Sequence, residues 1–202
     1  MPLARALARV LYRLGDARLF RFFAREANAP SLPRVASRPR LAWLSEKELA
    51  GLSAEAELDL APDKVAAAFA RGDLCAGAFD GDRLAGYCWF SSAPLPHLDG
   101  VWVAYSPHVL WIYKSYVRPA FRGRAIAPAL YSVADELAGR KGCKASLICV
   151  EAHNAPSIAA ALRAAHRPAG FAAYRVTREA VHAWCSPAVR RYGVRFFLPE
   201  HG

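Results

Sequence analysis

The chain has 202 residues, of which 54% are hydrophobic and 22% charged, so wholesale disorder is excluded and one medium-sized domain with a sizeable core is expected. Its formal net charge of +10 predicts an electropositive surface for anionic partners such as nucleotides, anionic lipid, acidic carrier proteins or nucleic acid. The charge by itself does not choose among these partners.

The cysteines argue against a metal site and against disulfides. There are 5 of them, an odd number, and none belongs to a Cys-x-x-Cys pair. Free cysteines within apolar runs indicate a reducing compartment. No apolar run reaches the roughly 18 residues of a membrane-spanning helix, so we expect a cytoplasmic protein without a membrane span.

The N-terminal segment has the pattern of a basic amphipathic helix. Its apolar residues recur at helical spacing, with arginines on the other side: Leu3, Leu7, Val10, Leu11 and Leu14 against Arg5, Arg9 and Arg13. We expect the helix to continue to Arg25 and a Pro-containing linker to follow, so residues 1–39 precede a domain at 40–202. Three roles are open: docking on that domain, peripheral contact of residues 1–28 with anionic membrane, and organelle targeting, which the absence of serine disfavours.

The region after the linker is predicted to begin with a strand and two helices. A short strand is expected at 40–44, and Ser45 with Glu48 forms the pattern of a capping box that opens a helix. A second helix is expected at 61–71. Two apolar runs follow, at 74–79 and 83–90, and the Asp-Gly between them predicts a hairpin.

Four antiparallel strands are expected before residue 118, since runs at 101–105 and 109–117 follow the hairpin. A basic turn then joins the last of them to a helix at 125–140, and a buried strand is predicted at 145–150. This β-α-β order favours parallel pairing of the two strands. Beyond it we expect a helix capped by Asn154 and strands at 171–176 and 194–198.

The basic turn is a candidate anion site. Backbone N–H groups at the start of a helix have no intrahelical partner, and the helix dipole places partial positive charge there. Arg118, Arg122 and Arg124 add charge, while Gly123 allows close approach of a ligand to the backbone.

Residues 117–130 resemble the acetyl-CoA-binding motif of the GNAT superfamily, whose signature is Gln/Arg-x-x-Gly-x-Gly/Ala. Arg122 stands at the first position, Ala125 where the family prefers Gly, and Ala127 at the last. A second block, the strand at 146–150 followed by Asn154 and a Gly-Phe pair, is also similar. The resemblance covers roughly residues 74–176. It implies an α+β fold with a mixed, mostly antiparallel sheet flanked by helices, in which the fourth and fifth strands splay apart around a thioester.

The resemblance implies acetyl-CoA as cosubstrate and no metal. It assigns the pyrophosphate to the backbone amides of six residues: Arg122, Gly123, Arg124, Ala125, Ile126 and Ala127. Tyr116 and Val117 would pair with the pantetheine arm, and Asn154 would contact the cofactor further along. Because Ala125 restricts the backbone, Ala125→Gly is expected to tighten acetyl-CoA binding.

Candidates for proton transfer lie after the buried strand. Glu151 and His153 stand where the family's site would open and are candidates for a base or an acceptor contact. The family often places a Tyr as acid where this chain has Ala161, and His166 lies close to that position. Each of the three candidates also has an ordinary structural interpretation, as a solvated loop residue or a helix-end cap. His97 lies in a loop of the kind that builds acceptor specificity.

These features favour an N-acyltransferase that moves an acetyl or other acyl group from coenzyme A to an amine by direct attack on the thioester. Two alternatives stay open: an acyl carrier protein as donor, and a non-catalytic acyl-CoA-binding module. Nucleic-acid binding rests on charge alone and is not favoured. The sequence does not identify the acceptor, the acyl chain length or the oligomeric state.

Overall fold

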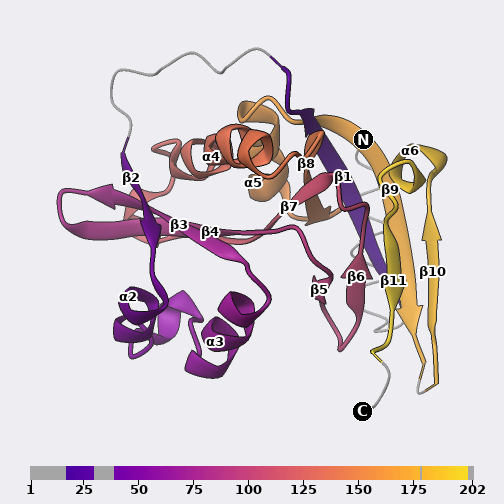
Figure 1. Cartoon of the computed structure of the whole chain (residues 1–202), viewed down its shortest axis with the longest axis horizontal. Coiled ribbons are helices and arrows are strands. Elements are labelled where there is room, and N and C mark those ends of the chain that lie inside the picture. The colour runs from indigo at the N-terminus through magenta and orange to yellow at the C-terminus, as the bar shows by residue number, and fades with distance from the viewer. Residues whose placement is uncertain (1–16, 30–38, 178, 200–202) are drawn as a thin grey trace.

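An eight-stranded mixed sheet runs through the computed structural model, which describes residues 17–29, 39–177 and 179–199 (Figure 1). The strand order is β10-β9-β1-β8-β7-β4-β3-β2. The strands are β1 Arg18–Glu26, β2 Arg40–Leu44, β3 Leu74–Asp80, β4 Arg83–Ser91, β7 Val109–Val117, β8 Ala145–Glu151, β9 Arg167–Val176 and β10 Val181–Cys185. All neighbours pair antiparallel except β7 and β8, which are parallel as the β-α-β order predicts.

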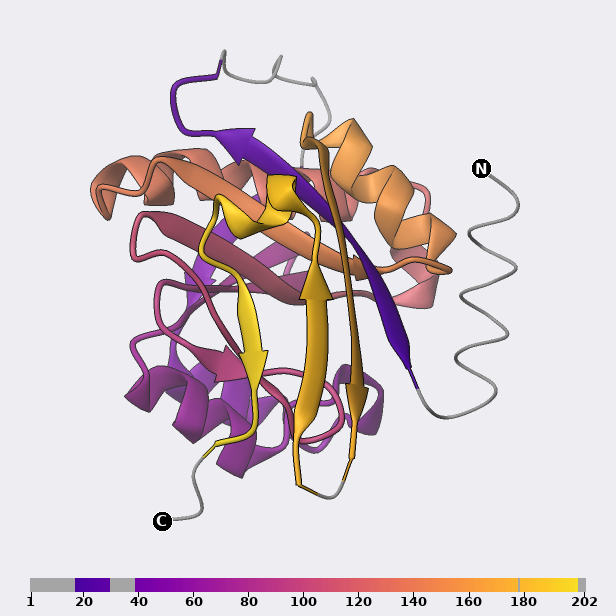
Figure 2. The same ribbon diagram turned by 90° about the vertical axis from the view of Figure 1, so that its right-hand side faces the viewer.

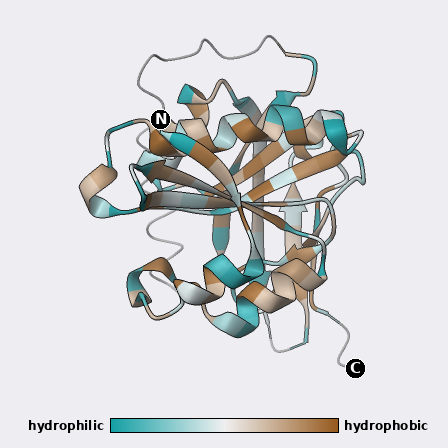
Figure 3. Ribbon diagram, turned by 60° about the vertical axis from the view of Figure 1, so that its left-hand side comes forward, coloured by the Kyte–Doolittle hydropathy of each residue, from teal (hydrophilic) through white to brown (hydrophobic). Residues whose placement is uncertain are grey.

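Helices cover both faces of this sheet. The helical segments are α2 Glu46–Gly51, η1 Ala56–Leu58, α3 Pro62–Ala70, η2 Pro119–Phe121, α4 Ile126–Arg140, α5 Ala155–Arg163 and α6 Pro187–Arg190. Helices α4 and α5 lie on one face and α2 and α3 on the other, and each alternates between hydrophobic and hydrophilic residues (Figure 3). The predicted α+β fold, a mostly antiparallel sheet flanked by helices, is therefore confirmed.

A second, three-stranded sheet packs beside the main one. It has the order β11-β6-β5, with β5 at Leu95–Pro96, β6 at Trp102–Ala104 and β11 at Arg195–Phe197. The expectation of four consecutive antiparallel strands is therefore wrong at 101–105, because β6 pairs with the C-terminal strand β11 instead of joining the hairpin. That partner lies more than 90 residues away in the sequence, where local pattern gives no information about pairing.

The predicted helix is wrong for Arg18 to Arg25, because this segment is strand β1. It lies between β8 and β9 and pairs with both, in the middle of one half of the sheet (Figure 2). Phe20 and Phe22 pack into one hydrophobic cluster and Phe23 into another, so aromatic side chains are buried on both faces. Residues 1–16 and 30–38, where the amphipathic helix and most of the linker were expected, lie outside the described residues.

Several local expectations are confirmed in detail. The capping box is complete, since the Ser45 hydroxyl accepts from the Glu48 N–H and the Glu48 carboxylate accepts from the Ser45 N–H. The Asp-Gly turn joins β3 to β4. The Asn154 side chain caps α5 by accepting from the N–H of Ser157 at 3.2 Å.

The buried position of β1 predicts a large loss of stability on truncation of its central side chain. Phe22 is fully buried, so Phe22→Ala should lower the free energy of unfolding by about 3–5 kcal/mol, measured by denaturant titration. Arg21→Ala on the same strand is the control and should cost about 1 kcal/mol or less. Equal effects of the two substitutions would contradict the placement of β1 inside the sheet.

Candidate functional site

The parallel strands β7 and β8 separate halfway along their length. They pair over four positions, from Val109 opposite Ala145 to Ile112 opposite Ile148. Beyond Ile112, β7 continues to Val117 and β8 to Glu151 without pairing to each other. A gap in the middle of the sheet is the result.

A bulge in β7 begins where the strands part. Tyr87 of β4 faces Tyr116, but Trp89, two residues on, faces Tyr113, so β7 carries one extra residue. Lys114 within this bulge has φ 44°, which is uncommon for a residue with a side chain. Because a bulge interrupts the ladder and bends its strand, it turns β7 away from β8.

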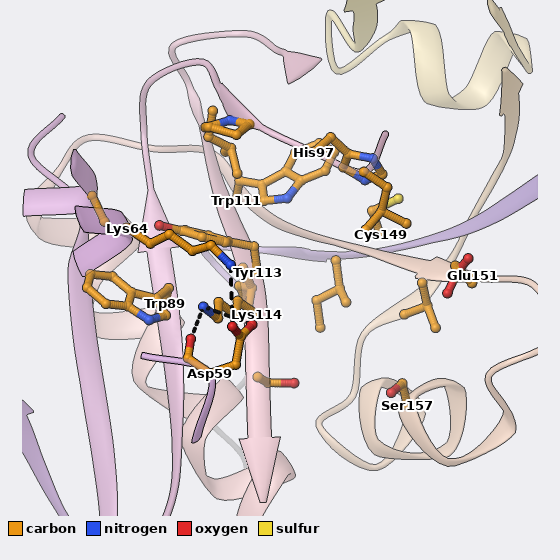
Figure 4. A pocket seen from close by; sticks show the side chains of 18 of the residues that line it. Asp59, Lys64, Trp89, His97, Trp111, Tyr113, Lys114, Cys149, Glu151 and Ser157 are labelled. Atoms are coloured by element: carbon orange, nitrogen blue, oxygen red, sulfur yellow. Dashed lines mark hydrogen bonds and ion pairs between the residues drawn. The ribbon is translucent and has the colours of Figure 1, made fainter. Parts of the chain in front are cut away.

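A cavity of about 670 Å³ occupies the gap and is lined by side chains from both faces of the sheet (Figure 4). Successive side chains of a strand point to opposite faces of the sheet, so the cavity has two different walls. Ile148 and Val150 face α4 and α5, where Tyr131, Asn154 and Ser157 complete the lining; we call this the helix side. The opposite side is formed by residues of β7, β8, α3 and the β5 loop: Trp111, Tyr113, Cys149, Glu151, Lys64, Arg71 and His97.

A pair of hydroxyl groups lies on the helix side. The Tyr131 hydroxyl of α4 is 2.7 Å from Oγ of Ser115, which follows the bulge. Burial raises the pKa of Tyr131, so its hydroxyl stays protonated at neutral pH. Sequence reasoning missed this pair, although a Tyr beside the apolar stripe of the 126–140 helix was visible.

Charged side chains on the opposite side are mostly paired with one another. Lys114 donates to the Asp59 carbonyl and lies 3.3 Å from its carboxylate. Asp73, which is 1% exposed, accepts from Tyr113 at 2.6 Å and from Arg71 at 2.7 Å. The other Asp73 oxygen and Nε of Arg71 have no hydrogen-bond partner among the described residues.

Glu151, predicted as a base or acceptor contact, does line the cavity. An arginine from β1 holds it in place, since Nη1 of Arg18 lies 3.3 Å from its carboxylate while the same guanidinium binds Asp99 at 2.7 and 2.8 Å. Cys149 also lines the cavity, and burial raises the pKa of its thiol well above the usual value. A thiolate nucleophile is therefore disfavoured at this position.

His166 lies in the core and does not line the cavity. It is 1% exposed, with Nε2 3.0 Å from Oγ of Ser146 and Nδ1 3.2 Å from the Ala164 carbonyl. Burial lowers its pKa to about 4, so it is a neutral structural group at pH 7. His153 is half-buried in the turn before α5, outside the cavity lining, and Asn154 both lines the cavity and caps that helix.

The basic turn has the backbone of an anion-binding site. Gly123 has φ 81° and Ala125 φ 56°, and Ala125 immediately precedes the first residue of α4. The first N–H groups of α4 and the charges of Arg122 and Arg124, both exposed, meet at this point. Tyr116 and Val117 lie on the unpaired end of β7, between the turn and the cavity.

Arg118 does not contribute its charge to this turn. It is 6% exposed, donates to the Leu84 carbonyl at 2.7 Å, and forms ion pairs with Glu55 and Glu57 near η1. Arg118 therefore ties β7 to the α2–α3 region. Arg122 donates to the Val117 carbonyl at 3.3 Å and Arg124 lies 3.6 Å from the Asp80 carboxylate, but both side chains are exposed and can reach a ligand.

Two negative findings bear on the site. No group of three or more His, Cys, Asp or Glu in the described ranges could hold a metal ion. Within the same ranges, no helix is both long and apolar enough to cross a membrane.

The fold and site define an α+β protein with a cavity between two diverging parallel strands and a basic helix start beside it. A model of the acetyltransferase (GNAT) family matches residues 39–166, which is more than half of the chain. The chain therefore belongs to the GNAT acetyltransferase family. A search of curated proteins finds no match.

Solved structures agree on the fold at low sequence identity. A GCN5-related N-acetyltransferase from Kribbella flavida is 15% identical over 94% of this chain and 67% of its own, with a TM-score of 0.54. A GNAT-family structure from Novosphingobium aromaticivorans is 16% identical over 78% of this chain, with a TM-score of 0.52, and one from Sphaerobacter thermophilus is 18% identical over 89%, with a TM-score of 0.51. The chain spans 62% and 56% of the length of the last two structures.

The left-handed backbone at Ala125 predicts a stabilising substitution. Ala125→Gly should raise the free energy of unfolding by about 1 kcal/mol, because glycine adopts positive φ without the clash of a Cβ atom. Ala127→Gly is the control: it lies inside α4, where glycine should instead cost about 0.5–1 kcal/mol. If both substitutions destabilise equally in thermal and denaturant unfolding, the positive φ of Ala125 is contradicted.

Proposed function

We propose that the protein transfers an acetyl group from acetyl-CoA to an amine. The observation that carries this proposal is the alignment, along one strand, of the open end of β7, the bulge at Lys114 and the helix start at Ala125. Coenzyme A has a diphosphate at one end and a thioester at the other, joined by an arm with amide groups. A helix N-terminus, a free strand edge and a cavity through the sheet suit these three parts in that order.

The cofactor would contact mostly backbone. The amides of residues 122–127 would bind the pyrophosphate, and Arg122 and Arg124 would add charge. The arm would lie along Tyr116 and Val117 and pass Asn154, so that the thioester reaches the cavity. Family membership and the exposed position of residues 122–125 support this arrangement.

The transfer itself forms a C–N bond and breaks the C–S bond. The neutral amine attacks the thioester carbonyl carbon, and backbone groups freed by the bulge are suited to stabilise the oxyanion. The attacking nitrogen then loses a proton and the departing thiolate gains one, so protons balance overall. Glu151 is the carboxylate placed to accept the first, directly or through water.

Tyr131 is the group placed to donate a proton to the thiolate. The family's usual Tyr position is Ala161 here, but Tyr131 brings a protonated hydroxyl to the helix side of the same cavity. Its bond to Ser115 fixes the hydroxyl beside the bulge. A tyrosine from α4 would then take the role that the family often gives to a tyrosine at the Ala161 position in α5.

The pyrophosphate assignment can be tested by binding. Replacing both Arg122 and Arg124 with Ala should weaken acetyl-CoA binding about tenfold in calorimetric titration, which is about 1.4 kcal/mol. S-acetylpantetheine lacks the pyrophosphate, so its affinity should not change. Arg140→Ala, at the opposite end of α4, is the matched control. Unchanged acetyl-CoA affinity in the double variant would contradict the assignment.

The proton donor can be tested by kinetics. Tyr131→Phe should lower kcat about 100-fold or more and leave acetyl-CoA affinity intact, because it removes one hydroxyl and keeps the packing. Tyr192→Phe is the control: it removes a hydroxyl that accepts from Arg191 outside the cavity lining, and it should keep kcat within a few-fold. Full kcat in Tyr131→Phe, measured by thiol release, would rule out its role as the acid.

The two alternatives give different outcomes with the same material. If the donor is an acyl carrier protein, the carrier loaded with an acyl group should support turnover and acetyl-CoA should not. A binding module predicts that acetyl-CoA raises the thermal midpoint by mass action without thiol release in the presence of amines.

A further inference from the structure

His97 is an imidazole in the cavity wall to which the proposed function assigns no role. It follows β5 and lies on the side of the cavity opposite α4 and α5, near Trp111 and Cys149 (Figure 4). The ring packs edge-on against Phe20, with centroids 5.0 Å apart, and against Phe196 at 5.5 Å. Packing on these rings fixes the orientation of the imidazole.

Hydrogen bonds determine which nitrogen of His97 carries its proton. The Tyr174 hydroxyl lies 3.2 Å from the carbonyl oxygen of Leu98, which can only accept, so the one hydroxyl proton is donated there. The same hydroxyl oxygen lies 3.2 Å from Nδ1 of His97. Nδ1 is then the donor in this second bond, and Nε2 is left as an unprotonated acceptor.

Nε2 has no hydrogen-bond partner among the described residues, although His97 lines the cavity. Burial lowers the pKa of His97 to about 4, so the ring stays neutral at pH 7. The site therefore presents a fixed lone pair to whatever occupies this part of the cavity. The groups that donate to such a lone pair are N–H and O–H.

Most of the cavity lining on the His97 side is apolar, with Phe20, Leu95, Leu98, Trp111 and Cys149. The charged groups that act on the His97 ring, Arg18 and Asp99, are paired with each other, and Arg18 also binds Glu151. On the facing wall, Lys64 and Lys114 pair with Asp59, and Arg71 pairs with Asp73, which leaves Nε of Arg71 and one Asp73 oxygen without partners among the described residues. A ligand with many hydroxyls would bring more polar groups than these two atoms can pair with, at about 1–3 kcal/mol for each buried group left unpaired.

We propose that the acceptor amine donates an N–H to Nε2 of His97, and that the acceptor is a primary amine on a compact apolar or aromatic group. This inference rests on the proposed acetyl transfer and narrows its substrate class. The hydrogen bond orients the nitrogen lone pair toward the thioester, while Phe20 and Trp111 contact the apolar group. Tyr174 acts as a positioning residue, since it selects the tautomer.

The substrate class is tested with the full chain, acetyl-CoA and a panel of amines, with thiol release as readout. We expect kcat/KM for 2-phenylethylamine and isopentylamine to exceed that for glucosamine and glycine by about 100-fold or more, as two or more unpaired polar groups would produce. Equal or higher values for the polar amines would overturn the inference.

The role of His97 is tested with two variants that distinguish the contribution of Nδ1 from that of Nε2. The side chain of His97→Asn can still donate to Tyr174 but has no atom at the Nε2 position, and kcat/KM should fall about 30-fold or more. In His97→Gln an amide oxygen can occupy the Nε2 position, and kcat/KM should stay within about fivefold of the unmodified chain. A purely structural role, anchoring to Tyr174, predicts the reverse order.

Further measurements separate failure of folding from failure of the inference. Both variants should stay folded, with thermal midpoints lowered to the same extent by loss of the ring contacts with Phe20 and Phe196, and should keep the acetyl-CoA affinity of the unmodified chain. Tyr174→Phe is a third variant, nearly equal in shape, and should raise KM for the amine several-fold through loss of the fixed tautomer. Reversed order of Asn and Gln, or equal activity of all three variants, would overturn the role of His97.

The inference and the proposed function fail in different ways. If the unmodified chain does not bind acetyl-CoA, or binds it and acetylates no amine of the panel, acetyl transfer to amines itself is contradicted. If it acetylates the polar amines best, or with no dependence on His97, only the inference fails.

Discussion

The early end of the β7–β8 pairing is the constraint on which the rest of the site depends. Two parallel strands in a sheet normally pair along their shared length, and here they stop after four positions. The extra residue in β7 and the positive φ of Lys114 coincide with that stop. Backbone groups that a continuous ladder would satisfy are thereby left facing a cavity, which is a costly arrangement unless water or a ligand pairs with them.

The same constraint divides the site into two approaches. On the helix side, Asn154 and the Ser115–Tyr131 pair surround the gap. On the other side, the loop after β5 brings His97, and Arg18 holds Glu151 at the rim. A donor and an acceptor entering from opposite faces would meet inside the sheet, which is the geometry that direct transfer requires.

Most expectations based on local sequence pattern were accurate. The capping box at Ser45, the Asp-Gly hairpin, the β-α-β unit and the basic helix start all follow from residues close in sequence, and all are present. Local pattern failed for β1, whose aromatic residues also fit a helical period. Its strand conformation depends on β8 and β9, which lie more than 100 residues away.

Site residues divide in the same way. The basic turn at 122–127 was identified from the sequence as a candidate anion site, because glycine, arginine and a helix start are adjacent there. Glu151 and His97 were found as residues flanking predicted strands, but not their partners Arg18 and Tyr174, since tertiary folding brings these together. His166 was named as a catalytic candidate from its spacing, and the structure places it in a buried hydrogen bond with Ser146, outside the cavity lining.

Amide hydrogen exchange with and without saturating acetyl-CoA shows directly whether the open edge of β7 and the start of α4 form one cofactor site. If they do, added cofactor should slow exchange together at residues 113–117 and 122–127. The edge strand β10, at the far side of the sheet, should be unaffected. Slowed exchange at β10, or none in either segment of the site despite saturation, would contradict the account.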